Sequence, residues 1–312
     1  MRLRTSSSAA PARLAGHGEL EYRVDVSRAA IAILISFAVA IGAITHGGFL
    51  VAAIGTTTSV LAGGTAGPGA PDPSPSVYEY DDEDLGAARV YWVDGQGVLD
   101  PLPPAGSREE QVWETFLRVT SISFAAKVIG DYTVGDNPQG ETLAYVAKYD
   151  DSPYWTLAVN LAGSDQPEVL IPTLVHEYAH LLSLGRDQME AAADDCATLD
   201  LVEGCLRASA ALWAFQGEFW SDLEDAPAPD NGDWDVTDEF YARYEDQFVS
   251  DYAATNVIED FAETFMVYVI EDAPTGDSVA ADKLRFMATV PGFPAIRDRI
   301  RGEFADDLGI VP

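Results

Sequence analysis

The chain has 312 residues, of which 51 are Asp or Glu and 18 are Lys or Arg, giving a formal net charge of −33. Residues 71–312 alone hold 13 basic and 48 acidic side chains. A domain with this charge repels phosphate backbones and anionic lipid headgroups, so we exclude nucleic acid as a partner. The length is sufficient for a sizeable hydrophobic core.

An apolar segment without a charged side chain runs from residue 29 to residue 70. Its densest part, residues 29–45, has about the length that crosses a bilayer, and arginines precede it. We therefore expect residues 1–28 to be a cytoplasmic leader and the chain beyond to be exported. A signal anchor or a cleaved signal peptide is expected over residues 29–62. The protein would be membrane-anchored with its main domain outside, or secreted.

Residues 63–86 are rich in Gly, Pro and Ser and end in the acidic run YEYDDEDLG. A segment of this composition buries little apolar surface, which predicts a disordered linker. A compact domain is expected to begin at residue 87 and to continue to residue 312.

The pattern beyond the linker alternates between short strands and helices, which predicts an α+β fold. Strands are expected at residues 88–95, 142–150 and 154–163. Helices are expected at residues 108–130, 171–184, 206–220, 256–273, 281–290 and 293–304. The helix at 171–184 is apolar on most sides and should be buried, with Pro172 close to its first turn.

His176, Glu177 and His180 form an H-E-x-x-H sequence on the expected helix 171–184. Residues i and i+4 lie on one helix face, so both imidazoles can reach a single metal ion, beside which Glu177 can act as a general base. Two unrelated histidines on a surface helix are the alternative. The apolar flanks and the lack of any other histidine beyond residue 46 favour a metal site.

A catalytic zinc site needs a third protein ligand, which here must be a carboxylate or a thiolate. Glu259 and Glu263 are four residues apart on an otherwise apolar helix, where carboxylates require a cation or a hydrogen bond. One of them can bind the metal while the other holds a ligand histidine by its second ring nitrogen. A solvated acidic stripe is the alternative interpretation.

The two motifs together resemble the gluzincin class of zinc metallopeptidases. The segment from Tyr252 to residue 265, YAATNVIEDFAETF, is similar in particular to the family of the anthrax lethal factor catalytic domain and the Pro-Pro endopeptidases. The resemblance implies a zincin-like domain with a small mixed sheet and one zinc ion bound by His176, His180 and Glu259. It also implies that Glu263 hydrogen-bonds to a ligand and that Tyr252 stabilises the oxyanion. The long separation of His180 from Glu259 indicates an insertion at residues 186–250.

The function implied is an exported endopeptidase that hydrolyses peptide bonds by a zinc-activated water, with Glu177 as general base. Its partner would be a protein or peptide substrate, and the strand at 154–163 is expected to pair with it by edge addition. The alternative is a catalytically silent zinc-binding or partner-binding cell-surface module of the same fold. The substrate and the oligomeric state do not follow from the sequence.

The chain has two cysteines, Cys196 and Cys205, nine residues apart within the insertion. An even number of cysteines in an exported chain predicts a disulfide. We expect this disulfide to have a structural role.

Overall fold

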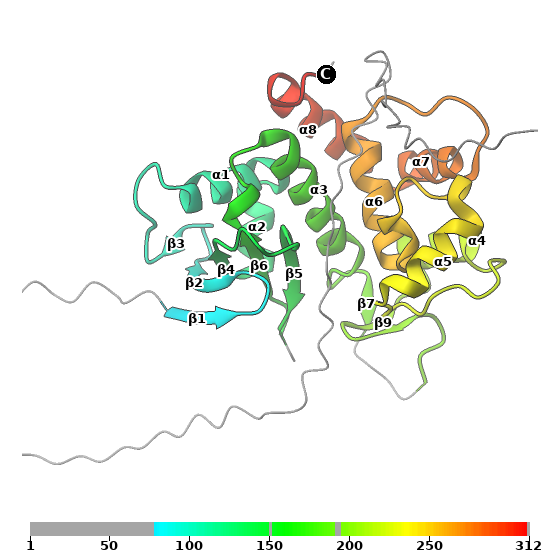
Figure 1. Cartoon of the computed structure of the whole chain (residues 1–312), viewed down its shortest axis with the longest axis horizontal. Coiled ribbons are helices and arrows are strands. Elements are labelled where there is room, and N and C mark those ends of the chain that lie inside the picture. The colour runs from blue at the N-terminus through cyan, green and yellow to red at the C-terminus, as the bar shows by residue number, and fades with distance from the viewer. Residues whose placement is uncertain (1–77, 150–151, 191–194, 311–312) are drawn as a thin grey trace, which may run out of the picture. The chain divides into compact units, whose positions relative to one another are not determined.

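The computed structural model describes residues 78–149, 152–190 and 195–310 (Figure 1). The expected leader, the expected signal anchor and the linker up to residue 77 lie outside the described residues. Among the helices of the described ranges, none combines the length and the apolar character that a membrane span requires.

The described residues form an α+β structure around a mixed sheet. Its strands are β1 (Tyr78–Asp82), β2 (Gly86–Val93), β3 (Leu99–Asp100), β4 (Ile129–Gly135), β5 (Ala144–Lys148) and β6 (Trp155–Asn160). The order across the sheet is β1-β2-β4-β6-β5, with β3 beside β2. Only β4 and β6 run parallel to each other, and the remaining pairs are antiparallel.

Strand β5 forms an edge of the sheet within the described residues, whereas β6 lies inside it. The strand expected at 154–163 corresponds to β6, which is hydrogen-bonded to β4 on one side and to β5 on the other. The expectation that this strand pairs with a substrate is therefore wrong, because both of its edges are already occupied. Its neighbour β5 lies at one end of the strand order, as β1 does at the other.

The acidic segment before residue 87 belongs to the sheet, so the expected disordered linker is wrong over its last nine residues. Strand β1 pairs antiparallel with β2, with Tyr78 opposite Val90. Leu85, in the turn between them, is completely buried. The ladder with β2 and this buried leucine hold a segment whose net charge indicated a solvated spacer, while Tyr78 and Tyr80 of β1 stay exposed.

Eight helices accompany the sheet in the described part of the chain. They are α1 (Arg108–Thr120), α2 (Ile122–Val128), α3 (Pro167–Ser183), α4 (Ala211–Phe219), α5 (Trp234–Tyr244), α6 (Val257–Ile270), α7 (Val279–Thr289) and α8 (Phe293–Leu308). Helix α3 contacts β5 and α1 on one side and packs along α6 on the other (Figure 1). Helices α4, α7 and α8 also pack on α6.

The single helix expected at 108–130 is divided at Ser121. This residue has a φ of 94°, which a helix interior does not allow, and its hydroxyl caps α2 by accepting from the Phe124 N–H. The chain leaves α2 at Ile129 and enters β4. The apolar periodicity continued through this break, so it concealed both the turn and the strand.

Helix α3 begins at Pro167, four residues before the expected start. Pro167 occupies the first helical turn, where a missing N–H is harmless. Pro172 lies inside the helix, contrary to the expectation that it would be near the first turn. The earlier start adds a full turn to the helix that carries the H-E-x-x-H sequence.

Residues 186–250, the segment expected to be an insertion, form a small antiparallel sheet and two helices. The sheet consists of β7 (Met189–Glu190), β8 (Asp200–Leu201) and β9 (Gly204–Leu206), in the order β7-β9-β8. The expected disulfide between Cys196 and Cys205 is present and joins β9 to the segment before β8. Helix α4 is shorter than the expected helix at 206–220, and α5 was not predicted.

Candidate metal centre

Helix α3 carries His176, Glu177 and His180 in a buried position. Their exposed fractions are 1%, 3% and 8%. On the same helix, Tyr178 contacts Phe124 of α2 and Phe265 of α6 edge to face, with ring centroids 4.9 and 6.4 Å away. This packing fixes the rotation of α3, so the two histidines face α6.

The start of α6 determines where Glu259 lies. Asn256 caps the helix, because its side-chain oxygen accepts hydrogen bonds from the backbone N–H groups of Ile258 (2.9 Å) and Glu259 (3.0 Å). Glu259 is therefore in the first turn, and Glu263 is one turn further along the same face. Both carboxylates are buried against α3.

One ring nitrogen of each histidine and one oxygen of Glu259 converge on a common point. The Nε2 atoms of His176 and His180 are 3.0 Å apart, and they lie 3.2 and 3.4 Å from Oε2 of Glu259. All three side chains are buried, and a set of their ligand atoms lies within 4.8 Å of one another. This buried group could hold a metal ion.

Glu263 orients one of these histidines from behind. Its Oε1 lies 2.8 Å from Nδ1 of His176, and because a carboxylate only accepts, Nδ1 carries the proton. Ser250 donates to the other oxygen of Glu263 at 2.6 Å. In the neutral ring, Nε2 of His176 therefore has its lone pair towards His180 and Glu259, which is the arrangement that a metal ligand needs.

The pKa shifts of Glu259 and His176 reflect how buried carboxylates are stabilised by positive charge close to them. Burial alone would raise the pKa of Glu259, but the charge of His180 and hydrogen bonds from both histidines outweigh it and hold the pKa well below the usual range. Burial would likewise lower the pKa of His176, but its bonds to Glu259 and Glu263 raise it well above the ordinary value. A cation among these atoms compensates the same carboxylates that the protonated imidazoles otherwise compensate.

Glu177 and Tyr252 complete the cluster. Burial raises the pKa of Glu177, against the opposing charges of His176 and His180, and its carboxylate accepts a hydrogen bond from the backbone of Val146 in β5. Tyr252 lies in a short 3₁₀ turn (Tyr252–Ala254), and its ring centroid is 5.9 Å from that of His176. Burial and the neighbouring carboxylates raise the pKa of its hydroxyl well above 10, so the hydroxyl remains a donor.

The structure thus brings together the six residues that the sequence singled out around one possible metal position. No protein-family model matches this chain, and neither curated proteins nor solved structures give a match. What can be said of the site therefore rests on its own geometry.

Three contributions to the site had no signal in the sequence. Ser250 donates a hydrogen bond to Glu263 from an irregular turn that no sequence pattern predicts. The backbone of Val146 reaches Glu177 because β5 is an edge strand, which depends on strand order. Trp234, in the insertion, contacts Tyr252 with a centroid separation of 6.0 Å.

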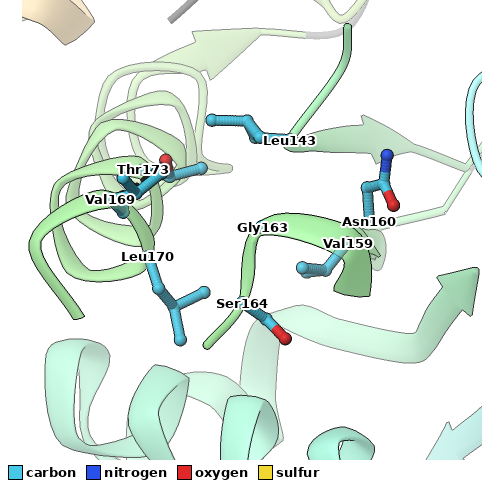
Figure 2. Close-up of a pocket in the computed structure, with 8 residues that line it drawn as sticks. All are labelled: Leu143, Val159, Asn160, Gly163, Ser164, Val169, Leu170 and Thr173. Atoms are coloured by element: carbon cyan, nitrogen blue, oxygen red, sulfur yellow. Dashed lines mark hydrogen bonds between the residues drawn. The ribbon is translucent and has the colours of Figure 1, made fainter. Parts of the chain in front are cut away.

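A small hollow near the start of α3 is separate from this cluster. Figure 2 shows Leu170 and Thr173 of α3 on one side of it and Leu143 and Asn160 on the other. None of the residues that line it is a histidine, a cysteine or a charged side chain. The hollow therefore offers no group for acid–base chemistry or metal binding.

Proposed function

We propose that this protein is an exported zinc-dependent endopeptidase of the gluzincin type, with a zincin-like fold. The observation that carries the proposal is the convergence of His176, His180 and Glu259 beside Glu177 and Tyr252. A metal-binding module would need only the first three residues. A buried carboxylate and a buried hydroxyl beside them supply what hydrolysis requires in addition.

Zinc fits the donor atoms and their spacing. Two imidazole nitrogens and one carboxylate oxygen are a common protein set for catalytic zinc, which leaves a further position open. Two atoms bound to one zinc ion in tetrahedral geometry lie roughly 3.3 Å apart. The three separations here, 3.0, 3.2 and 3.4 Å, are close to that value.

Glu177, Tyr252 and Glu263 each have a separate role in the proposed reaction. A zinc ion held by His176, His180 and Glu259 would lower the pKa of its water towards about 7 and polarise a carbonyl. Glu177 would take the proton from the attacking water and pass it to the leaving amine. Tyr252 donates a hydrogen bond to the oxyanion, while Glu263 keeps the His176 ring in place through Nδ1.

A peptide substrate is supported by the edge of β5 beside α3, with which no other strand of the described residues pairs, although its Val146 N–H donates to Glu177. The hydrogen bond from the Asn160 N–H to the Leu143 carbonyl (2.8 Å) fixes which residues of the strand face β6. The backbone groups of Ala144, Val146 and Lys148 consequently face away from the sheet. An extended peptide can add to this edge and bring its carbonyl next to Glu177.

Export is supported by the disulfide between Cys196 and Cys205, since such bonds persist in oxidising compartments. The apolar segment at residues 29–62 is the expected targeting signal, either retained as an anchor or removed. The strongly acidic composition suits a soluble domain outside the cell.

The proposal is tested by incubating the purified protein with a peptide library and reading cleavage by mass spectrometry. We expect cleavage that a chelator abolishes and that added zinc restores. Elemental analysis should give one zinc per chain, lost in His176→Ala.

The matched control is Glu177→Gln, which should keep the zinc and lose cleavage, because Glu177 is not among the three converging ligands. Zinc binding without cleavage of any peptide by the unaltered protein would favour the silent metal-binding module. Protein without zinc would refute both functions.

A further inference from the structure

Trp234 is partly exposed and lies next to Tyr252, which itself packs against the candidate ligand His176. It is the first residue of α5, and 38% of its surface is accessible. Its ring lies 6.0 Å from the ring of Tyr252, which in turn lies 5.9 Å from that of His176 (centroid distances). Since Tyr252 is buried, Trp234 is the accessible end of a row of three rings that leads to the ligands.

Hydrogen bonds join the segment before α5 to the start of α6. The exposed Trp234 therefore lies on a backbone with a fixed position. Asn231 donates from its side chain to the carbonyl of Thr255 at 2.9 Å, and Asn256 donates to the carbonyl of Asn231 at 3.2 Å. Asn256 is also the cap that places Glu259. The residues just before α6 therefore position both a candidate metal ligand and the start of α5, where Trp234 lies.

Hydrogen bonds within the insertion add to this constraint. Asn231 also donates to the Thr237 hydroxyl at 3.2 Å, and Asp233 caps α5 by accepting from the Asp235 N–H at 3.0 Å. Trp234 lies between these anchors. A rigid, partly exposed aromatic ring of this kind offers a flat apolar surface at little entropic cost to a ligand.

We infer that Trp234 is a specificity-determining residue, whose exposed ring forms one wall of a subsite for a large apolar side chain of the peptide substrate. The inference rests on the proposed function. The chemistry selects the side chain, because an indole face recognises aromatic or aliphatic groups and the exposed neighbours Asp233 and Asp235 repel carboxylates. A contact of this size separates a large apolar side chain from a methyl group by roughly 10–200-fold.

Peptide binding to the zinc-loaded, full-length Glu177→Gln protein tests the inference without turnover. The probes are acetylated, amidated alanine peptides, each with a single Phe at a successive position, and an all-alanine reference. Calorimetry should give at least about 10-fold tighter binding for Phe at one position than for the reference. Trp234→Ala should remove this gain and leave the affinity for the reference peptide unchanged, while Trp234→Phe should keep part of it.

Trp92 provides the matched control. It is also an exposed tryptophan, at 53%, but it lies on β2, separated from β5 by β4 and β6. Trp92→Ala should keep the whole gain, and zinc content should be the same in all variants.

Two results would overturn the inference. One is that no position shows a gain with Phe in the Glu177→Gln protein. The other is that Trp234→Ala weakens all peptides equally, as expected if Trp234 only supports Tyr252. Neither result affects the proposed function, which depends on cleavage by the unaltered protein and its loss with a chelator.

Discussion

Tyr252 is the residue on which the catalytic assignment can be tested most directly. Its ring is buried, so Tyr252→Phe preserves the packing and removes one donor. We expect kcat to fall by roughly 10²-fold or more with a smaller change in KM, because this hydrogen bond strengthens as charge develops on the oxyanion. Zinc content should be nearly unchanged, and the loss in Tm should be small, because the variant gives up only the hydrogen bond between the hydroxyl and Glu259. Steady-state kinetics and a melting curve provide the measurement.

Tyr132 is a suitable control for that experiment. It is a buried tyrosine of β4 whose hydroxyl donates to the Glu109 carbonyl at 3.2 Å, away from the metal centre. Tyr132→Phe should cost about 1 kcal/mol of stability and leave kcat intact. Full activity in Tyr252→Phe combined with a lowered Tm would mean that Tyr252 is likewise only a core residue.

The sequence could predict the relative positions of those side chains whose spacing on a helix places them on the same face. His176 and His180 share a face because of their spacing, as do Glu259 and Glu263. Which carboxylate reaches the Nε2 atoms and which one reaches Nδ1 of His176 was left open by the residues themselves, because it depends on where α6 begins. Ser250 could not be anticipated, since its contact with Glu263 depends on the path of an irregular turn.

At the scale of elements, a buried ion pair joins α6 to α7. Lys283 and Asp260 are both completely buried, and Nζ lies 2.6 Å from Oδ2. The Trp220 indole donates to the same oxygen at 2.7 Å, and the ammonium group lies 4.0 Å from the centroid of the Phe248 ring. Burial raises the pKa of Asp260 and lowers that of Lys283, and in each case the partner opposes the shift.

Lys283→Met should lower the free energy of unfolding by about 3–5 kcal/mol, because it leaves the Asp260 carboxylate buried without its cation. The double variant Lys283→Met, Asp260→Asn should recover much of this loss, since no buried charge remains. Urea unfolding of the single and double variants measures both effects. Equal stability of the two variants would show that the charge of Asp260 is compensated elsewhere.

The disulfide should stabilise the insertion. Joining Cys196 to Cys205, nine residues apart, removes about 2.7 kcal/mol of chain entropy from the unfolded state. Mass spectrometry of the unreduced protein should find no free thiol, and replacing both cysteines by serine should lower Tm. Two free thiols in protein purified from the exported fraction would contradict the pairing.

The sequence predicted the long elements that have a clear apolar periodicity. It did not predict elements that are short or that depend on tertiary contacts for their stability. Helices α3 and α6 bury long, mostly apolar runs of residues, so their patterns were visible. Helix α5 buries only Thr237 and Phe240 along its length, and β7–β9 have two or three residues each. These elements depend on contacts with the rest of the fold, which a local pattern does not contain.

For the molecule as a whole, metal binding should be coupled to stability. The ligands lie on α3 and α6, so they meet only in the folded chain, and an ion that binds there stabilises the native state. Free zinc at a thousandfold excess over Kd contributes about 4 kcal/mol. For a domain of this size, that corresponds to roughly 8–16 °C in Tm.

Melting curves with and without a chelator measure this coupling. The unaltered protein should lose stability on chelation, and His176→Ala should not respond. A chelator that leaves Tm of the unaltered protein unchanged would contradict the assignment of the cluster as a metal centre.

The burial of Lys283 also has a consequence for chemical labelling. The chain has three lysines: Lys127 is exposed, Lys148 donates to the Glu203 carbonyl at 2.8 Å, and Lys283 is completely enclosed. An amine-reactive ester should therefore modify Lys127 at once and Lys283 only in molecules whose α7 has separated from α6. The rate at which peptides containing Lys283 gain the label, read by mass spectrometry, would then give the frequency with which this helix pair opens.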